Sequence, residues 1–219
     1  MQLLLDTADP DEWARLLPMG LFTGITTNPL LLSRANMPDP DWPDLFARAA
    51  GLGAQTLHVQ VTGPVDSYVS QAERIYALGA AAGIEGVVKV PCVGEALPHV
   101  PRIKALGGRV LLTAVYNAKQ MVLASALKAD FIAPYFARIS EAGLDGEATL
   151  TDMLAIQRAC SHKTTILVAS LRNGDQVRTL AAQGHTCFTL PPKVADDLLT
   201  DPQTRAAFDE FEAAANADV

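Results

Sequence analysis

Lys89 is the residue of this sequence whose setting most clearly needs a chemical reason. It lies in the apolar run 86–91, where an extended strand would bury its ammonium group. Burying a charged amine costs several kcal/mol unless a partner or the loss of the proton compensates. One interpretation is a Schiff-base nucleophile, because desolvation lowers a lysine's pKa and leaves neutral amine near neutral pH. The alternative is a lysine whose stem packs while its head group reaches water or pairs with Asp6.

Three further charged residues could take part in the same chemistry. Asp6 ends the apolar run 2–6, where a carboxylate could act as a general acid or base on a substrate hydroxyl. It could instead cap the first helix, a task that Asp9 could serve equally well. Arg138 and Arg172 follow two late strands by two or three residues, and guanidinium forks there could hold a phosphate or a sulfonate. Each alone would more often form a surface salt bridge, but as a pair they favour an anion site.

Short β-rich runs alternate with longer helical runs along the whole sequence. Eight strands are predicted, over residues 2–6, 22–28, 56–62, 86–91, 109–116, 131–135, 164–170 and 186–191. Helices are predicted over residues 10–17, 42–52, 64–83, 94–106, 118–127, 150–159, 173–183, 193–199 and 202–215. Because parallel neighbours need right-handed crossovers, this alternation predicts an α/β protein, a (β/α)8 TIM barrel with an additional C-terminal helix. The competing open, doubly wound sheet would place a glycine-rich turn after the first strand, and residues 5–8 contain no glycine.

Polar side chains gather near the C-terminal ends of the predicted strands, which is where TIM barrels place their chemistry. Besides Asp6 and Lys89, these residues are Thr26, Asn28, Gln60, Thr113, Tyr135 and Ser170. The period-two alternation of a strand points most of them inward. His58 is expected to be an inward, hydrogen-bonded core residue. The histidines form no ligand set, so no metal and no cofactor is predicted.

Composition narrows the possible partners. The 219 residues are 49 % apolar, which predicts a globular chain with one aliphatic core. With 17 basic and 24 acidic residues the net charge is -7, which argues against nucleic acid and anionic lipid as partners. Three widely spaced cysteines predict a reducing, cytoplasmic setting, and the charge-free stretch 16–33 is too polar and too interrupted to cross a membrane.

Six segments of the sequence resemble the transaldolase family, and together they extend over nearly the whole chain. They are residues 5–8, 24–29, 88–91, 113–116, 133–138 and 169–172. The Thr-Thr-Asn-Pro and Val-Lys-Val-Pro segments among them are specific. The short chain is similar to the compact branch of the family, which includes fructose-6-phosphate aldolases and small transaldolases.

The resemblance implies roles for the polar residues. Lys89 would form an imine with the ketose carbonyl, and Asp6 would move the proton of the hydroxyl beside the cleaved bond. Gln60, Thr113 and Tyr135 would hold the water that takes part in imine formation. The residues implied in substrate binding are Thr26, Asn28, Arg138, Ser170 and Arg172, with Asn28 on the dihydroxyacetone portion. No metal is then required.

Three hypotheses about activity follow. Gln60, Tyr135 and Ala133 are similar to the aldolases, which favours cleavage of fructose 6-phosphate or a related ketose phosphate into dihydroxyacetone and an aldose phosphate. Arg172 is closer to the transaldolases, which would pass the three-carbon unit to another sugar phosphate. Leu30 stands where the family usually has Ser, and this departure motivates the third hypothesis, a barrel that binds sugar phosphates without catalysis.

The chain is expected to divide into a catalytic barrel, residues 1–200, and a C-terminal helix, residues 201–219. The helical segment is amphipathic, with Phe208 and Phe211 three residues apart, and no ninth strand follows it. The resemblance implies a ring-based homodecamer in which this helix packs on a neighbouring subunit. The alternative is that the helix packs back over its own barrel.

Overall fold

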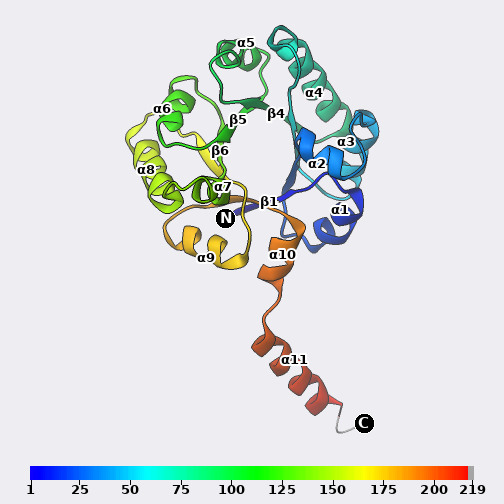
Figure 1. The fold of residues 1–219 in the computed structure, drawn as a ribbon. Helices are drawn as coiled ribbons and strands as arrows, with labels where there is room; N and C mark the ends of the chain where they lie inside the picture. The colour runs from blue at the N-terminus through cyan, green and yellow to red at the C-terminus, as the bar shows by residue number, and fades with distance from the viewer. Residues whose placement is uncertain (217–219) are drawn as a thin grey trace.

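The computed structural model describes residues 1–216 and shows a closed barrel of parallel strands with helices outside it (Figure 1). The strands are β1 (Gln2–Asp6), β2 (Gly24–Thr26), β3 (Thr56–Gln60), β4 (Glu85–Pro91), β5 (Arg109–Val115), β6 (Phe131–Pro134), β7 (Thr165–Val168) and β8 (Cys187–Leu190). Each strand pairs with the next in sequence, and β1 closes on β8. The predicted TIM barrel is confirmed, and the open doubly wound sheet is wrong.

The strands separate two apolar layers. Inward-pointing residues such as Leu4, Val87 and Leu111 form a small cluster inside the barrel. Outward-pointing residues of the same strands pack under the helices in a larger core. Because side chains alternate along a strand, the residue two positions after Val87 also points inward, and that residue is Lys89. The barrel interior is therefore apolar for most of its depth and becomes polar where the strands end.

The helices lie on the outside of the barrel. They are α1 (Pro10–Leu16), α2 (Pro29–Arg34), α3 (Trp42–Gly51), α4 (Tyr68–Ala82), α5 (Val100–Lys104), α6 (Lys119–Ala126), α7 (Phe136–Glu141), α8 (Gly146–Ala159), α9 (Gly174–Ala182), α10 (Pro192–Leu199) and α11 (Pro202–Ala215). Helices α1 to α9 lie in the connections between successive strands, and α10 and α11 follow the last strand. The sequence did not predict α2 and α7. Each has six residues and begins within a few residues of a strand's end, too short for a helical period to show. No helix within residues 1–216 is long and apolar enough to cross a bilayer.

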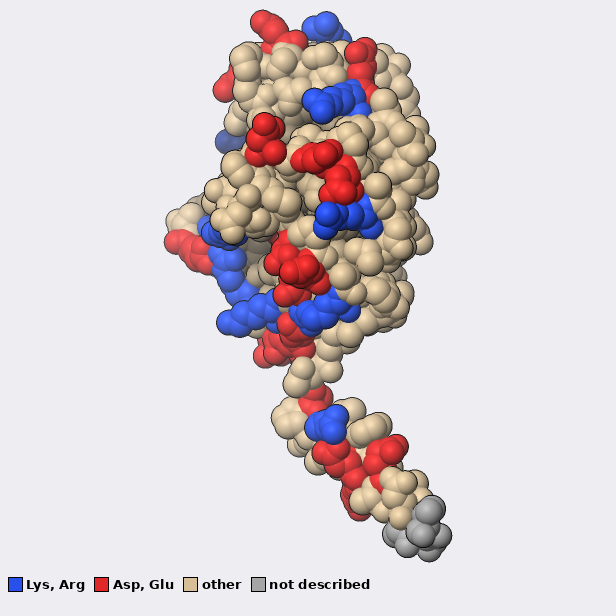
Figure 2. All heavy atoms as spheres, turned by 90° about the vertical axis from the view of Figure 1, so that its right-hand side faces the viewer, with Lys and Arg blue, Asp and Glu red and all other residues tan. Residues whose placement is uncertain are grey.

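Helix α11 stands clear of the barrel in both overall views (Figures 1 and 2). None of its residues is buried, and Phe208 and Phe211 are 50 % and 70 % exposed. Asp201 caps the helix by accepting a hydrogen bond from the Thr204 amide at 2.7 Å. In the structure of the single chain, residues 202–215 therefore do not pack over their own barrel. The predicted C-terminal segment is described as far as residue 216, and residues 217–219 lie outside the described part of the chain.

His58 confirms one expectation and corrects another. It is fully buried inside the barrel, where its ring lies 5.4 Å from that of Phe131. Neither ring nitrogen has a hydrogen-bond partner among residues 1–216, so the predicted hydrogen bonding is wrong. Burial holds the pKa of His58 well below its usual value, with the charge of Lys89 adding to the effect. His58 is therefore a neutral imidazole that packs among the apolar side chains inside the barrel, below the polar residues at the strand ends.

Candidate active site

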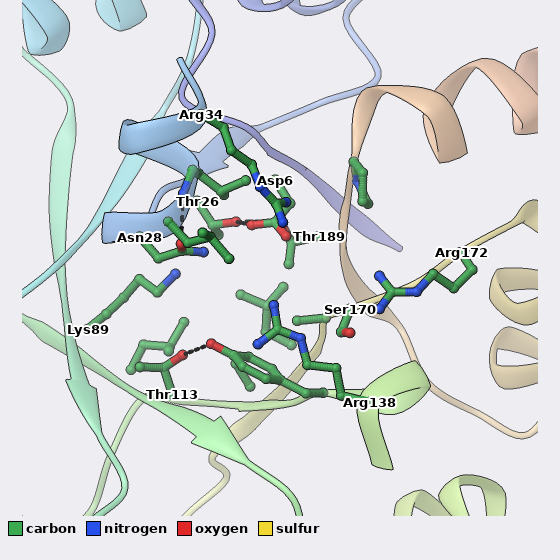
Figure 3. Close-up of a pocket in the computed structure, with 18 residues that line it drawn as sticks. Asp6, Thr26, Asn28, Arg34, Lys89, Thr113, Arg138, Ser170, Arg172 and Thr189 are labelled. Carbon is green, nitrogen blue, oxygen red and sulfur yellow. Dashed lines mark hydrogen bonds between the residues drawn. The ribbon is translucent and has the colours of Figure 1, made fainter. Parts of the chain in front are cut away.

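A cavity opens at the C-terminal ends of the strands and brings together most of the predicted site residues (Figure 3). Nine of them line it: Asp6, Thr26, Asn28, Lys89, Thr113, Tyr135, Arg138, Ser170 and Arg172. They come from six of the eight strands and from the segments directly after them. The alternation that was predicted from sequence thus brings polar groups from six strand ends into one cavity.

Lys89 lies on β4 at the base of this cavity. Its side chain is buried, with 4 % of the residue exposed, and its Nζ donates a hydrogen bond to the Thr27 carbonyl oxygen at 2.6 Å. Burial lowers its pKa from 10.5 to about 8, while the charge of Asp6 opposes that shift. At pH 7.5 such a group is about one quarter neutral amine, against about one part in a thousand for a pKa of 10.5. The barrel mouth therefore holds a lysine that is partly in its neutral amine form near neutral pH.

Asp6, the last residue of β1, faces Lys89 with its own supporting hydrogen bond. Thr26 Oγ1 donates to Asp6 Oδ1 at 2.7 Å, and Thr26 Oγ1 also lies 2.6 Å from Thr189 Oγ1. Burial raises the pKa of Asp6, and the charge of Lys89 acts in the opposite direction. The cap of α1 is Asp9, which accepts from the Asp11 amide at 3.0 Å. Asp6 is therefore free to act on a bound molecule.

Asn28 is held in place by the helix that it begins. Its Oδ1 accepts a hydrogen bond from the Leu31 amide at 3.0 Å, which caps α2. A capping asparagine uses its carbonyl oxygen and leaves its amide nitrogen as a donor. Figure 3 shows this side chain beside Lys89. The cap thus positions a neutral donor next to the amine.

Tyr135 and Thr113 form a second polar pair on the opposite wall. Their hydroxyl oxygens lie 2.9 Å apart, and burial raises the pKa of Tyr135. The ring of Tyr116 packs edge-on against Tyr135 at 5.5 Å, and the Arg138 guanidinium lies 4.8 Å from the Tyr135 ring centre. The tyrosine is therefore fixed by contacts at its ring and at its hydroxyl.

Two residues at the rim differ in how fully their polar groups are satisfied. Ser170 has a left-handed backbone, with φ at 60°, and its buried Oγ has no hydrogen-bond partner among residues 1–216. Such orphaned hydroxyls are uncommon in folded proteins and call for a ligand or water. Arg172, in contrast, pairs with Glu141 of α7 through contacts of 3.0 Å from Nε and from Nη2.

Gln60 is the predicted site residue that the structure does not bring into this cavity. It ends β3 in register with Lys89, yet it lines a neighbouring cavity with Trp42 of α3 and Gln71 of α4. Sequence reasoning also missed two residues that line the main cavity, Thr189 and Arg34. Thr189 could have been found, because it is a polar residue near the end of a predicted strand like the others. Arg34 gave no such signal, since it lies on the unpredicted helix α2.

No group of three or more His, Cys, Asp or Glu side chains within residues 1–216 is placed to hold a metal ion. The cavity instead combines a buried amine, a carboxylate, hydroxyls and guanidinium groups. This set suits nucleophilic and proton-transfer chemistry on a polar, anionic substrate.

Comparison with known proteins gives a consistent result over the whole chain. The family model described as "Transaldolase/Fructose-6-phosphate aldolase" matches residues 3–219. A probable transaldolase of Phenylobacterium zucineum is 31 % identical over 211 residues, covering 96 % of this chain and 94 % of the relative. Probable transaldolases of Desulfotalea psychrophila and Anaeromyxobacter dehalogenans are 27 % and 30 % identical, each over 96 % of this chain and 96 % and 94 % of their own. The chain therefore belongs to the transaldolase/fructose-6-phosphate aldolase family.

Proposed function

We propose that the protein is a Schiff-base aldolase that cleaves or forms fructose 6-phosphate or a related ketose phosphate. The observation that carries this proposal is the buried Lys89 amine, with its pKa lowered to about 8, in one cavity with the Asp6 carboxylate. A neutral amine is needed to attack a ketone, and a nearby acid or base is needed to move protons. Asp6 on β1 and Lys89 on β4 both line the cavity at the C-terminal ends of the barrel strands.

The reaction begins when the neutral Lys89 amine attacks the ketose carbonyl carbon to form a carbinolamine. Loss of water gives a protonated imine, which acts as the electron sink. Asp6 then accepts the proton of the hydroxyl on the β carbon of the imine, the bond between the α and β carbons breaks, and the β carbon becomes the aldehyde of the leaving sugar. The aldose phosphate leaves, and the electron pair forms an enamine on Lys89. Protonation of the enamine carbon and hydrolysis release dihydroxyacetone and regenerate the amine.

The remaining residues bind and orient the substrate. Asn28 and Thr26 lie beside the amine and carboxylate, where they can hold the hydroxyls of the dihydroxyacetone portion. Thr113 and Tyr135 can hold the water that is lost and regained. Arg138, Ser170 and Arg172 are proposed at the phosphate. Gln60 shares the register of Lys89, and it can join the site only if its side chain turns from the neighbouring cavity.

A transaldolase is the second candidate, favoured by the names of the similar proteins and by Arg172. Gln60 and Tyr135 are similar to the aldolases and so support the aldolase. In an aldolase, water releases the dihydroxyacetone unit from the lysine before an acceptor sugar takes it. The discriminating measurement is the release of free dihydroxyacetone from fructose 6-phosphate with no acceptor aldehyde. Steady release supports the aldolase. Product that forms only after erythrose 4-phosphate is added assigns the transferase.

Borohydride trapping tests the covalent step itself. Reduction in the presence of fructose 6-phosphate should leave a stable adduct on the peptide that contains Lys89, found by mass spectrometry. Lys104→Met is a matched control, because Lys104 is the ion-pair partner of Asp130 outside the cavity. Lys89→Met should abolish the adduct, and Lys104→Met should keep it. An unmodified wild-type protein would refute the aldolase and support the non-catalytic binding barrel.

We further propose that α11 packs on a neighbouring subunit of a homo-oligomer, a decamer by the family resemblance. Exposed Phe208 and Phe211 on a helix that leaves its own barrel support this arrangement. Deleting the residues after Thr200 should reduce the mass measured by light scattering while the barrel stays folded. An unchanged mass would refute the role of α11. A cytoplasmic location is also proposed, supported by the free thiols of Cys92, Cys160 and Cys187.

A further inference from the structure

Arg34 is the third arginine that lines the cavity, and neither the sequence patterns nor the comparisons give it a role. It ends helix α2, which begins directly after the Asn28 cap. Leu30 and Leu31 of the same helix also line the cavity, so this helix forms part of the wall. Figure 3 shows Arg34 entering from one side and Arg138 from the other, with both guanidinium groups directed into the cavity.

The cavity concentrates positive charge in an otherwise acidic chain. Arg34, Lys89, Arg138 and Arg172 line it together with one carboxylate, that of Asp6, whereas the whole chain has a net charge of -7. Two of these four cations, Lys89 and Arg172, have a carboxylate close to them. Lys89 faces Asp6, whose charge favours the protonated amine, and Arg172 pairs with Glu141.

Arg34 and Arg138 are the two cations of the cavity that form no ion pair within residues 1–216, although the charge of Arg138 also acts on Asp6. Arg138 instead lies over the Tyr135 ring, a contact that orients the guanidinium without neutralising it. Two free guanidinium groups therefore face one space.

The hydroxyl of Ser170 gives an independent sign of a ligand at the same place. Its residue is 8 % exposed, and its Oγ lacks a partner within residues 1–216 although it lines the cavity. The left-handed backbone at Ser170 fixes this orientation at some conformational cost, since non-glycine residues rarely adopt positive φ. Figure 3 places Ser170 between Arg138 and Arg172. A hydroxyl held without a partner beside the Arg138 guanidinium, which forms no ion pair, suits an anion.

We propose that Arg34 joins Arg138 and Ser170 at the anion site of the cavity, and that the two guanidinium groups together select a dianionic phosphate ester over a monoanionic sulfonate. This inference rests on the proposed function in so far as the phosphate belongs to the ketose. A phosphate monoester carries about -1.5 to -2 charges at pH 7, which two guanidinium groups without ion-pair partners can balance better than one. Arg172 shares its charge with Glu141 and contributes less than Arg34.

Titration with inorganic phosphate tests the site without any turnover. Calorimetry at fixed ionic strength should detect binding to the wild-type protein, weakened roughly tenfold in Arg34→Ala by loss of one charged hydrogen bond. Arg74→Ala is the matched control, because Arg74 is an exposed arginine that lines the neighbouring cavity. It should bind phosphate as the wild type does. No binding to the wild type, or equal affinity of Arg34→Ala and wild type, would overturn the proposal.

Kinetics then test the selection of a dianion. Arg34→Ala should raise KM for fructose 6-phosphate roughly tenfold with little change in kcat, and should leave KM for unphosphorylated fructose unchanged. The same variant should reduce the preference for the phosphate over the 6-deoxy-6-sulfonate analogue. An unchanged preference would overturn the selection. If borohydride traps no adduct, the proposed aldolase fails, while the phosphate titration still decides the role of Arg34.

Discussion

Replacing Lys89 with Met should stabilise the protein at neutral pH, although it destroys the proposed nucleophile. The reason is that the folded state holds this ammonium group in a poorly solvated place. Its pKa falls from 10.5 in the unfolded chain to about 8 in the barrel. Each tenfold change in proton affinity corresponds to about 1.4 kcal/mol, so the charged amine costs the folded state about 3 kcal/mol below pH 8.

Methionine is close to lysine in shape and carries no charge, so it removes that cost. It also removes the hydrogen bond from Lys89 Nζ to the Thr27 carbonyl, a loss of about 1 kcal/mol. The net expectation for Lys89→Met at pH 7 is a gain of about 2 kcal/mol in the free energy of unfolding. Between pH 8 and 10.5 the unfolded wild-type chain binds more protons than the folded one, so wild-type stability rises with pH there. The advantage of the variant should fade across this interval.

Urea unfolding of the wild type and Lys89→Met at several pH values between 7 and 10.5 measures the difference in their free energies of unfolding. Because the two proteins share all other titratable groups, the pH dependence due to those groups largely cancels in this difference. Lys104→Met provides the control with the opposite sign. Lys104 Nζ donates to Asp130 Oδ2 at 2.6 Å at a partly exposed site, so its replacement should reduce stability. A Lys89→Met protein that is destabilised at pH 7 as much as Lys104→Met would refute the reasoning. So would a gain that stays constant up to pH 10.5.

Three shorter predictions concern activity. The rate of borohydride trapping should rise with pH and level off above about pH 8, because the lowered pKa of Lys89 leaves its amine neutral above that value. A trapping rate that does not change from pH 6 to 9 would contradict this prediction. Asp6→Asn should lower kcat by roughly 10²- to 10⁴-fold while the ketose adduct on Lys89 still forms, as mass spectrometry can check, and near-normal turnover would remove Asp6 as the base. Arg138→Ala should raise KM for phosphorylated ketose by roughly tenfold or more with fructose little affected, as parallel steady-state assays can measure, and equal effects on both sugars would exclude it from the anion site.

The residues that strands position could be predicted from sequence, because two simple rules fix their direction. Alternation points every second side chain inward, and parallel strands bring their C-terminal ends to one rim. These rules located Asp6, Lys89, Thr113 and Tyr135 on the cavity. They failed for Gln60, the last residue of β3, where the strand stops and the long side chain can lie to either side. The alternation of a strand determines whether a residue points to the inside or the outside of the barrel. It does not determine where a long, flexible side chain lies at the end of the strand.

Of the two cavity-lining arginines on short helices, the sequence identified Arg138 but not Arg34. Arg138 was found because it follows β6 by only a few positions, whereas Arg34 lies on a helix whose short apolar run looks like any buried segment. At about 1.5 Å of rise per residue, the six residues of α2 advance roughly 9 Å, a distance that an extended arginine can span back toward the cavity. The strand alternation predicts side-chain directions only up to the end of a strand, so it cannot predict that an arginine on the following helix reaches back into the cavity. In the proposed function the tasks are separated: strands hold Lys89 and Asp6, the proposed reacting groups, while α2 and α7 carry Arg34 and Arg138, which are proposed to bind the substrate's anion. Substitutions on these helices should therefore change which anion binds without disturbing the amine and carboxylate below.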